Sequence, residues 1–342
     1  MNRRATPLNS QPRHTARGLS RGLSLVELMV AIAVGLILVA GLATLFANSS
    51  QSGNELDKSI RQMENGRFAV DLLSEDMSVA GYYGELAVEG LTWSNPAACA
   101  TTVATLGWDN AASTVPVFLT GLNSTQAAAL ACLPNHKSGT PALVLRRLDT
   151  TAAAPAAAAS ASAWVQTSRC ATDPNATRFI ISGTPADFTL RDLNCTAINN
   201  VRRYVSRIYY VATCNECGTD SIPTLKRAEI YTTGTTVSPL AEGIEEVAFE
   251  YGFDTNGDGV PEIFRNALSG TAGAADNEWS NVVAARLYVM SRSTETSPGF
   301  TDGKTYSLGL AGTRGPFTDS YKRRVYSTTA RLNNPAGIRE VP

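Results

Sequence analysis

The residues with the clearest potential to bind a ligand lie in segment 254–259, which reads DTNGDG. Oxygen-bearing side chains at alternate positions, followed by a glycine, match the first half of an EF-hand calcium loop. Glu262 falls at the ninth position and could contribute, but the twelfth position holds Arg265 in place of the bidentate glutamate. Asn-Gly and Asp-Gly are also the usual residues of a hairpin turn. The segment predicts a turn between two strands and, compatible with it, a weak calcium site formed by Asp254, Asn256, Asp258 and Glu262.

Cysteines are the second group that could do chemistry. All six follow the apolar segment 28–47 and are expected in an oxidising compartment, where an even number implies disulfides. Proximity in the sequence favours the pairs Cys99–Cys132, Cys170–Cys195 and Cys214–Cys217. The last pair could instead be half of a zinc site or a redox centre. Zinc needs two more ligands, of which only His136 is available outside the first 22 residues, and the preceding segment predicts a strand running into a turn. A structural disulfide is therefore favoured.

Catalytic motifs are missing from the sequence. It contains no nucleophile elbow, P-loop, dinucleotide fingerprint or HExxH run. A Ser-His-Asp or Cys-His arrangement would have to use His136, which lies in an apparent loop. We therefore expect no enzyme, no catalytic residues and no required cofactor, with calcium as the one possible ligand.

The apolar segment 28–47 contains no charged residue and has about the length that crosses a bilayer as a helix. Arginines precede it, with no acidic residue among the first 22, so the positive-inside rule leaves the N-terminus in the cytoplasm and places the chain after about Asn48 outside. A cleaved signal peptide would have a shorter apolar core and a small-x-small site, which Leu45-Phe46-Ala47 does not provide. The remainder of the chain is mildly acidic without a dominant basic cluster, so nucleic acid is not expected as an obligate partner.

Glu27 stands at the start of this segment, where a carboxylate is costly and is a functional hypothesis by default. Residues 22–29, GLSLVELM, resemble the class III signal of type IV prepilins. In that family a peptidase cuts after the glycine on the cytoplasmic side, and the new N-terminal residue is methylated. Cleavage after Gly22 makes Glu27 the fifth residue of the mature chain, the family's spacing, whereas cleavage after Gly18 would place it too far away.

The resemblance implies that Gly22 and Leu23 are the processing residues. It also implies that Glu27 partners the new N-terminal amine of a neighbouring subunit during assembly, because a buried charge needs a partner. The alternative is a glutamate that snorkels to the headgroups and only marks the membrane boundary.

A long helix is predicted to continue beyond the membrane. Apolar residues recur at helical spacing at Leu56, Ile60, Met63, Val70, Leu73 and Met77, and Gly81 is a plausible stop. Gly35, Gly41, Gly53 and Gly66 are points where such a helix could bend or melt. Residues 63–84, MENGRFAVDLLSEDMSVAGYYG, resemble the end of the long helix in PilW-type minor pilins, where an ENGR segment is followed by an AGY segment.

The rest of the chain predicts a β-rich head. Short runs rich in Val, Ile, Tyr or Thr predict strands at Ala142–Leu148, Arg178–Ser182, Val201–Thr213, Leu225–Thr232, Ile244–Phe253, Val282–Ser291 and Arg324–Leu332. The low-complexity segment 150–163 predicts a loop between strands. Segments EEVAFEYG, VVAARLYVMSR and RRVYSTTARLNN resemble the closing strands of the same family.

Together these features predict an α+β, pilin-like fold: a long helix packed on an antiparallel sheet with disulfides. Expected parts are a prepilin leader (1–22), a transmembrane or filament-core helix (23–47), its amphipathic continuation (48–80) and a periplasmic or extracellular head (81–342).

The resemblance implies a minor pilin, a structural subunit that helps type IV pilus assembly at the tip or in the initiating complex. The expected partners are other minor and major pilins, the prepilin peptidase, the inner membrane and the assembly machinery. The expected location is the inner membrane before assembly and the surface pilus afterwards, with twitching motility, adhesion or DNA uptake as downstream roles. The alternatives are a type II secretion pseudopilin and a membrane-anchored adhesin or binding head.

Overall fold

The computed structural model describes residue 22 and residues 24–88, 90–158, 161–174, 177–268 and 278–340. The chain forms two compact units, Met1–Asn54 and Glu55–Pro342. Helix α1, Leu25–Ser78, has its first part in the first unit and its second part in the second unit. Its bounds confirm the long N-terminal helix that the sequence predicted.

The described part of the first unit is the apolar part of α1. Its large hydrophobic side chains, from Leu25 to Phe46, are exposed. A helix bonds its backbone N–H and C=O groups internally, so such a segment can lie in hydrocarbon without unsatisfied polar groups. By its length and composition, α1 is long and apolar enough to cross a membrane. Gly35, Gly41 and Gly53 do not interrupt it.

In the second unit, α1 buries one face in the main hydrophobic core. Ala69, Leu73 and Met77 are fully buried and Val70 nearly so, at the three- and four-residue spacing of one helix face. Strands of two antiparallel sheets supply much of the rest of this core, together with residues between elements such as Tyr83, Trp108 and Phe118. Of the amphipathic stripe that the sequence predicted, Val70, Leu73 and Met77 form this contact, whereas Leu56 and Ile60 are exposed.

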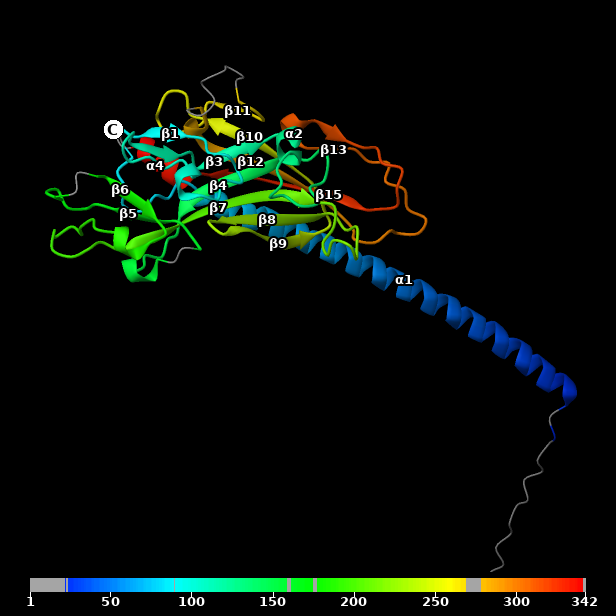
Figure 1. The fold of residues 1–342 in the computed structure, drawn as a ribbon. Coiled ribbons are helices and arrows are strands. Elements are labelled where there is room, and N and C mark those ends of the chain that lie inside the picture. The colour runs from blue at the N-terminus through cyan, green and yellow to red at the C-terminus, as the bar shows by residue number, and fades with distance from the viewer. Residues whose placement is uncertain are drawn as a thin grey trace, which may run out of the picture. The chain divides into compact units, whose positions relative to one another are not determined.

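The first sheet has β7 at its centre (Figure 1). The strand order is β3-β4-β7-β5-β6, and β8 pairs with another part of β7 and with β9. The bounds are β3 Leu119–Leu122, β4 Ala142–Leu148, β5 Trp164–Thr167, β6 Phe179–Ser182, β7 Val201–Ala212, β8 Thr224–Tyr231 and β9 Gly234–Glu242.

The second sheet has the order β11-β10-β12-β15 and is antiparallel throughout. Its strands are β10 Ile244–Phe253, β11 Ile263–Arg265, β12 Val282–Arg292 and β15 Arg323–Arg331. Two small pairs complete the strands: β1 Thr92–Ser94 with β2 Thr114–Pro116, and β13 Tyr306–Ser307 with β14 Thr313–Arg314. Two short helices, α2 Ser124–Ala128 and α4 Asn333–Arg339, accompany the 3-10 turns η1 Val103–Thr105, η2 Pro155–Ala157, η3 Pro185–Asp187, η4 Trp279–Asn281 and η5 Gly309–Ala311.

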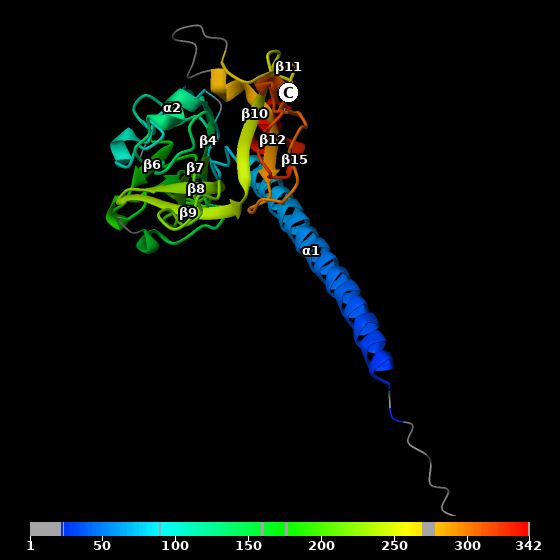
Figure 2. The same cartoon turned by 90° about the vertical axis from the view of Figure 1, so that its right-hand side faces the viewer.

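Each of the seven predicted strands is present, but the expectation of a single sheet was wrong. The chain passes from the first sheet to the second between β9 and β10, which only Gly243 separates (Figure 2). Gly243 has a φ of 71°, and a Cβ there would lie 2.5 Å from the carbonyl oxygen of Arg292. A left-handed glycine lets the chain turn sharply while its backbone approaches β12. Strand β9 was not predicted, because most of its side chains are polar or half-exposed.

Polar side chains of α1 fix the helix against both sheets. The Asp76 carboxylate accepts hydrogen bonds from Tyr209 (2.7 Å) and Arg207 (2.9 Å), both on β7. The Gln62 amide donates to the backbone carbonyls of Ser291 (3.0 Å) and Lys322 (2.8 Å), on the side of the second sheet. The Asp76 carboxylate and the Gln62 amide are buried or half-buried, so leaving either one unpaired would destabilise the fold. Their hydrogen bonds therefore fix the rotation of the helix about its axis and its position along the sheets.

Gly66 of α1 lies directly against Tyr326 of β15. A Cβ at this position would overlap the Tyr326 ring and lie 3.1 Å from the Ser291 hydroxyl oxygen. The sequence suggested Gly66 as a point where the helix could bend. The helix is continuous there, and the glycine instead makes room for the sheet.

We expect Gly66→Ala to lower the melting temperature of the full chain in detergent. Overpacking costs about 1–3 kcal/mol, which exceeds the gain of about 1 kcal/mol from alanine's helix propensity. Gly53→Ala is the matched control, since nothing lies within 4 Å of its Cβ position, and it should not lower the melting temperature. A Gly66→Ala protein as stable as the wild type would show that Tyr326 moves aside without cost.

Candidate processing and assembly site

A reciprocal pair of hydrogen bonds opens α1. The Ser24 hydroxyl accepts the backbone N–H of Glu27 (3.1 Å), and the Glu27 carboxylate accepts the backbone N–H of Ser24 (3.2 Å). The backbone N–H of Leu28 donates to the carbonyl of Ser24 (3.1 Å), which is the first bond of the helix. This is a capping box, which satisfies two N–H groups that a helix start would otherwise leave free. Sequence reasoning singled out Glu27 but missed its partner, although the S-x-x-E spacing is the signature of this cap.

The capping box starts the helix just after the predicted cleavage point. Gly22 is exposed and lies outside the helix, and Leu23 lies outside the described residues. Ser24 itself lies outside the helix, as an N-cap residue does. Glu27 is also the only charged residue between Leu25 and Asn54, so the carboxylate stands alone at the end of an otherwise uncharged helix segment.

The exposed apolar surface of the first unit needs a covering. Large exposed hydrophobics recur around the helix, among them Leu28 (52%), Leu36 (65%) and Phe46 (77%). A contiguous surface of this kind marks a membrane or protein interaction site. Either lipid or the apolar helices of other subunits could provide that cover.

The cysteines form three disulfides: Cys99–Cys132, Cys170–Cys195 and Cys214–Cys217. This is the pairing that sequence proximity favoured. The first two disulfides join cysteines that are 33 and 25 residues apart in the sequence. A cross-link that closes a longer loop removes more entropy from the unfolded chain and so stabilises the fold more. Since every sulfur is bonded to another, none is available in this state as a zinc ligand or as the thiol of a Cys-His pair. His136 instead places its Nε2 atom 3.0 Å from the Thr140 carbonyl oxygen, within the loop before β4.

The acidic loop 254–262 joins β10 to β11, so the predicted turn between two strands is present. The Asp254 side chain is buried at its start and accepts the backbone N–H groups of Gly257 (2.6 Å) and Gly259 (2.8 Å). Asp258 accepts the N–H of Val260 (2.8 Å), and Glu262 accepts that of Thr255 (2.7 Å). These bonds fold the loop back on itself.

Three of the four predicted calcium ligands converge. One carboxylate oxygen each of Asp254, Asp258 and Glu262 lie within 4.8 Å of one another. Asn256 stands beside them, with its amide 3.0 Å from an oxygen of Asp258. Arg339 of α4 also approaches, with its guanidinium 3.2 Å from Asp254.

The charge on Asp254 is already neutralised in part. Burial raises the pKa of this carboxyl, but the N–H groups of Gly259 and Gly257 and the Arg339 guanidinium outweigh it, so the pKa lies below its ordinary value. Arg339 is held in place by the Ser280 carbonyl (3.2 Å) and the Asn281 side chain (2.5 Å). Calcium binding at this loop stays a prediction.

Comparison with known proteins gives two family matches. The model of the type IV pilus-assembly protein W family (PilW) matches residues 208–334, and the prokaryotic N-terminal methylation motif matches residues 17–43. A type IV-like pilin from Thermus thermophilus is similar over 80% of this chain and 97% of its own, with 12% identity and a TM-score of 0.35. None of the curated protein sequences is a significant match.

The two family matches confirm the predicted resemblance to PilW-type pilins and to a prepilin signal, and they support a minor pilin in type IV pilus assembly. The methylation motif spans Gly22, Glu27 and the first turns of α1, and the apolar helix fits a membrane-anchored pilin. The PilW match spans the last five residues of β7, all of β8, β9, β10, β11, β12 and β15, and the start of α4. The pilin family points to a structural role.

We expect millimolar calcium to raise the melting temperature of the full chain by a few degrees. A ligand that binds only the folded state stabilises it by about 1.4 kcal/mol at a free concentration ten times its dissociation constant. Asp258→Asn should remove the increase, because it takes one carboxylate from the cluster while leaving the buried Asp254 intact.

Asp57→Asn, on the exposed face of α1, is the matched control and should keep the calcium effect. Equal melting temperatures with and without calcium would mean that no ion binds and that Arg339 and the backbone N–H groups of the loop suffice to balance Asp254.

Proposed function

We propose that this chain is a minor pilin that is cut after Gly22, methylated at Leu23 and packed through α1 into a type IV pilus. The observation that carries the proposal is the isolated Glu27 carboxylate in the cap of an exposed apolar helix, directly after the predicted cleavage point. The match of the methylation motif to the same residues supports it.

Cleavage creates the electrostatic requirement that Glu27 meets. The new α-amino group of Leu23 enters a surrounding of low polarity, where an unpaired charge is strongly unfavourable. A carboxylate from one neighbouring subunit neutralises this amino group. The Glu27 carboxylate of this chain is neutralised by the α-amino group of another subunit. The Glu27 carboxylate also accepts the backbone N–H of Ser24 in its own helix cap. When the subunit docks in the filament, the carboxylate therefore exchanges this N–H for the ammonium group of a neighbouring subunit.

The arginines before the apolar segment support a single-pass orientation with the N-terminus in the cytoplasm. The head then lies outside, where its three disulfides are stable. Before assembly the chain resides in the inner membrane, and afterwards it is part of the surface pilus. Its direct partners are the prepilin peptidase, other minor and major pilins and the assembly machinery.

The head favours a place at the filament tip or in the initiating complex. It extends from Glu55 to the C-terminus and contains two sheets, which is more than a repeated shaft subunit needs. The PilW match within the head favours a pilus over a secretion pseudopilus. Adhesion, twitching motility or DNA uptake would follow from the filament and not from catalysis by this chain.

The decisive experiment is the N-terminal mass of the chain recovered from membranes with and without the prepilin peptidase. We expect a peptidase-dependent start at methylated Leu23. An intact leader, or cleavage near Ala47, would contradict the proposal and leave a membrane-anchored or secreted head.

Two substitutions separate the charge of Glu27 from its capping role. Glu27→Gln keeps an acceptor for the Ser24 N–H but removes the charge, so it should be processed normally and recovered poorly in sheared filaments. Ser24→Ala removes the capping hydroxyl at a cost of about 1 kcal/mol but keeps the charge, so it should enter filaments better than Glu27→Gln. The opposite order would assign Glu27 to capping alone.

Gold labelling of the head on intact filaments tests the position in the pilus. We expect label at one end of each filament. Uniform labelling along the shaft would contradict the tip position without contradicting the pilin assignment.

A further inference from the structure

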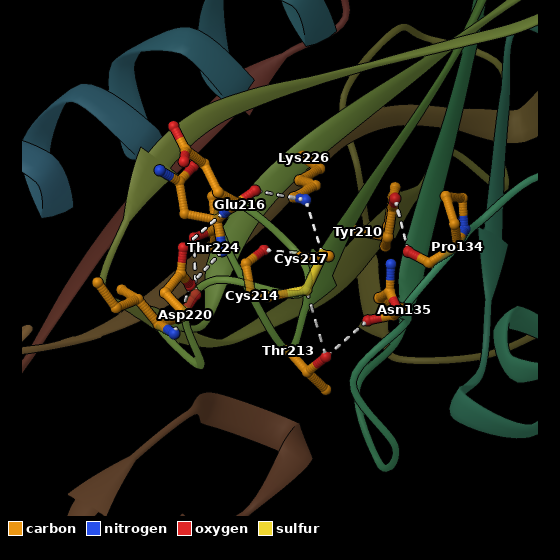
Figure 3. Close-up of a disulfide and its surroundings, with 12 residues drawn as sticks. Pro134, Asn135, Tyr210, Thr213, Cys214, Glu216, Cys217, Asp220, Thr224 and Lys226 are labelled. Atoms are coloured by element: carbon orange, nitrogen blue, oxygen red, sulfur yellow. Dashed lines mark hydrogen bonds between the residues drawn. A yellow bond between two sulfur atoms is a disulfide. The ribbon is translucent and has the colours of Figure 1, made fainter.

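The Cys214–Cys217 disulfide lies in the turn after β7, and its two sulfurs have different surroundings (Figure 3). Cys214 is 5% exposed, whereas Cys217 lies at the surface. A reagent in solution therefore reaches the Cys217 sulfur first. The other two disulfides are separated by 33 and 25 residues and close long loops, but this one links residues three apart.

Hydrogen bonds hold this turn without help from the disulfide. The Asp220 carboxylate accepts the backbone N–H groups of Asn215 (2.8 Å), Glu216 (2.6 Å) and Ile222 (2.9 Å). The Asn215 amide also donates to Glu242 at the end of β9 (2.7 Å). A cross-link between residues three apart restricts the unfolded chain little, so its removal costs less than the loss of a long-range cross-link. The two sulfurs would therefore stay close together after reduction.

A buried lysine points at the Cys217 sulfur from β8 (Figure 3). The Lys226 ammonium lies 3.4 Å from this sulfur and 2.9 Å from the Asn215 carbonyl oxygen, and the residue is 7% exposed. Among the described residues, none has a carboxylate oxygen within 4 Å of this ammonium. Burial lowers the pKa of Lys226, although Asp220 acts against the shift.

The lysine favours the reduced state of the pair. A buried cation without an anion in direct contact is unfavourable, and a thiolate at Cys217 would supply that anion at contact distance. The disulfide state offers the ammonium only a neutral sulfur. Stabilising the thiolate of a dithiol makes the corresponding disulfide a stronger oxidant.

We propose that Cys214–Cys217 is a thiol–disulfide exchange site whose partner is a protein with an accessible dithiol, with Cys217 as the reacting sulfur and Lys226 as the residue that stabilises its thiolate. The turn provides access at Cys217, a fixed scaffold through Asp220 and a counter-charge. None of these three features is needed for a disulfide that only cross-links the chain.

The exchange balances as a two-electron reaction. A partner thiolate attacks the Cys217 sulfur, the bond between the Cys217 and Cys214 sulfurs breaks, and Cys214 leaves as a thiolate that takes up a proton. The second thiolate of the partner then attacks its own sulfur in the mixed disulfide and releases the Cys217 thiolate beside Lys226. The partner dithiol is oxidised to a disulfide, and the pair in this chain is reduced to a thiolate and a thiol.

A redox titration of the full chain in detergent tests the proposal. The protein is equilibrated in mixtures of reduced and oxidised dithiothreitol, free thiols are alkylated, and each cysteine is quantified by peptide mass spectrometry. We expect Cys214 and Cys217 to become alkylated at potentials where the other four cysteines stay oxidised, without loss of the folded state. Reduction of all three disulfides together, or only on unfolding, would overturn the proposal.

The role of Lys226 is tested by Lys226→Met, which keeps the length of the side chain and removes the charge. We expect about a tenfold lower equilibrium constant for reduction, equivalent to about 30 mV toward more reducing potentials. Lys304→Met, at an exposed position, should leave the constant unchanged. An unchanged constant in Lys226→Met would overturn the role of the lysine.

The identity of the reacting sulfur is tested with single-cysteine variants and oxidised glutathione. Cys214→Ser retains the exposed thiol and should form a mixed disulfide at Cys217 at least ten times faster than Cys217→Ser forms one at Cys214. Equal rates, or the reverse order, would contradict the assignment of Cys217. The redox titration of the wild-type protein is a second measurement, and its result does not depend on how these variants fold.

Discussion

The head depends on the burial of one face of α1 between two sheets, and the carboxylate of Asp76 decides how that face is oriented. Arg207 and Tyr209 lie two positions apart on β7 and therefore project from the same side of the strand. Both donate to Asp76, and Arg147 of β4 lies within 3.5 Å of it. Burial, followed by the charge of Asp76, raises the pKa of Tyr209, which keeps it protonated as a donor. Rotating the helix would leave the buried Asp76 carboxylate unpaired, and an unpaired buried charge strongly destabilises the folded state.

Buried cations in the head are balanced in three ways. Arg323 has carboxylates from Glu245, Asp302 and Asp319 around its guanidinium. Arg146, which is fully buried, instead donates to the carbonyls of Val117 and Pro96 and to the Thr120 hydroxyl, and so holds the segments after β1 and before β3. Lys226 has one carbonyl and a sulfur. The first two arrangements are complete within the folded chain, whereas the third becomes complete only when the sulfur carries a charge.

Helix α1 carries a carboxylate near each end, Glu27 and Asp76, and the two groups have different surroundings. Near its C-terminal end a carboxylate is buried, fully paired and fixed, so it stabilises a single packing arrangement. At its N-terminus the Glu27 carboxylate is exposed and, within the described part of the chain, bonded only to a backbone N–H, so it can change partner at little cost. A single helix can therefore anchor a stable head and present an exchangeable charge, because the environment of each carboxylate, and not its chemistry, differs.

The sequence alone determined the features that depend on local pattern. The apolar run, the arginines before it and the position of Glu27 predicted a membrane segment and a prepilin signal, and period-3.6 and period-2 patterns located α1 and seven strands. Adjacent cysteines also indicated the disulfide pairing, since short separations are easily closed. The acidic loop 254–262 was visible as a motif, but the partial neutralisation of Asp254 by Arg339 was not, because Arg339 lies 85 positions away in the chain.

Only the tertiary structure decided which distant residues meet. The division into two sheets depends on one left-handed glycine, Gly243, whose conformation no periodicity reveals. The close approach at Gly66 requires Tyr326 from β15, and the charge beside Cys217 comes from Lys226 on the next strand. Such contacts follow from strand register and from packing of the whole core. Local patterns set the period of each element and the face it buries, but they do not specify which partner that face will contact.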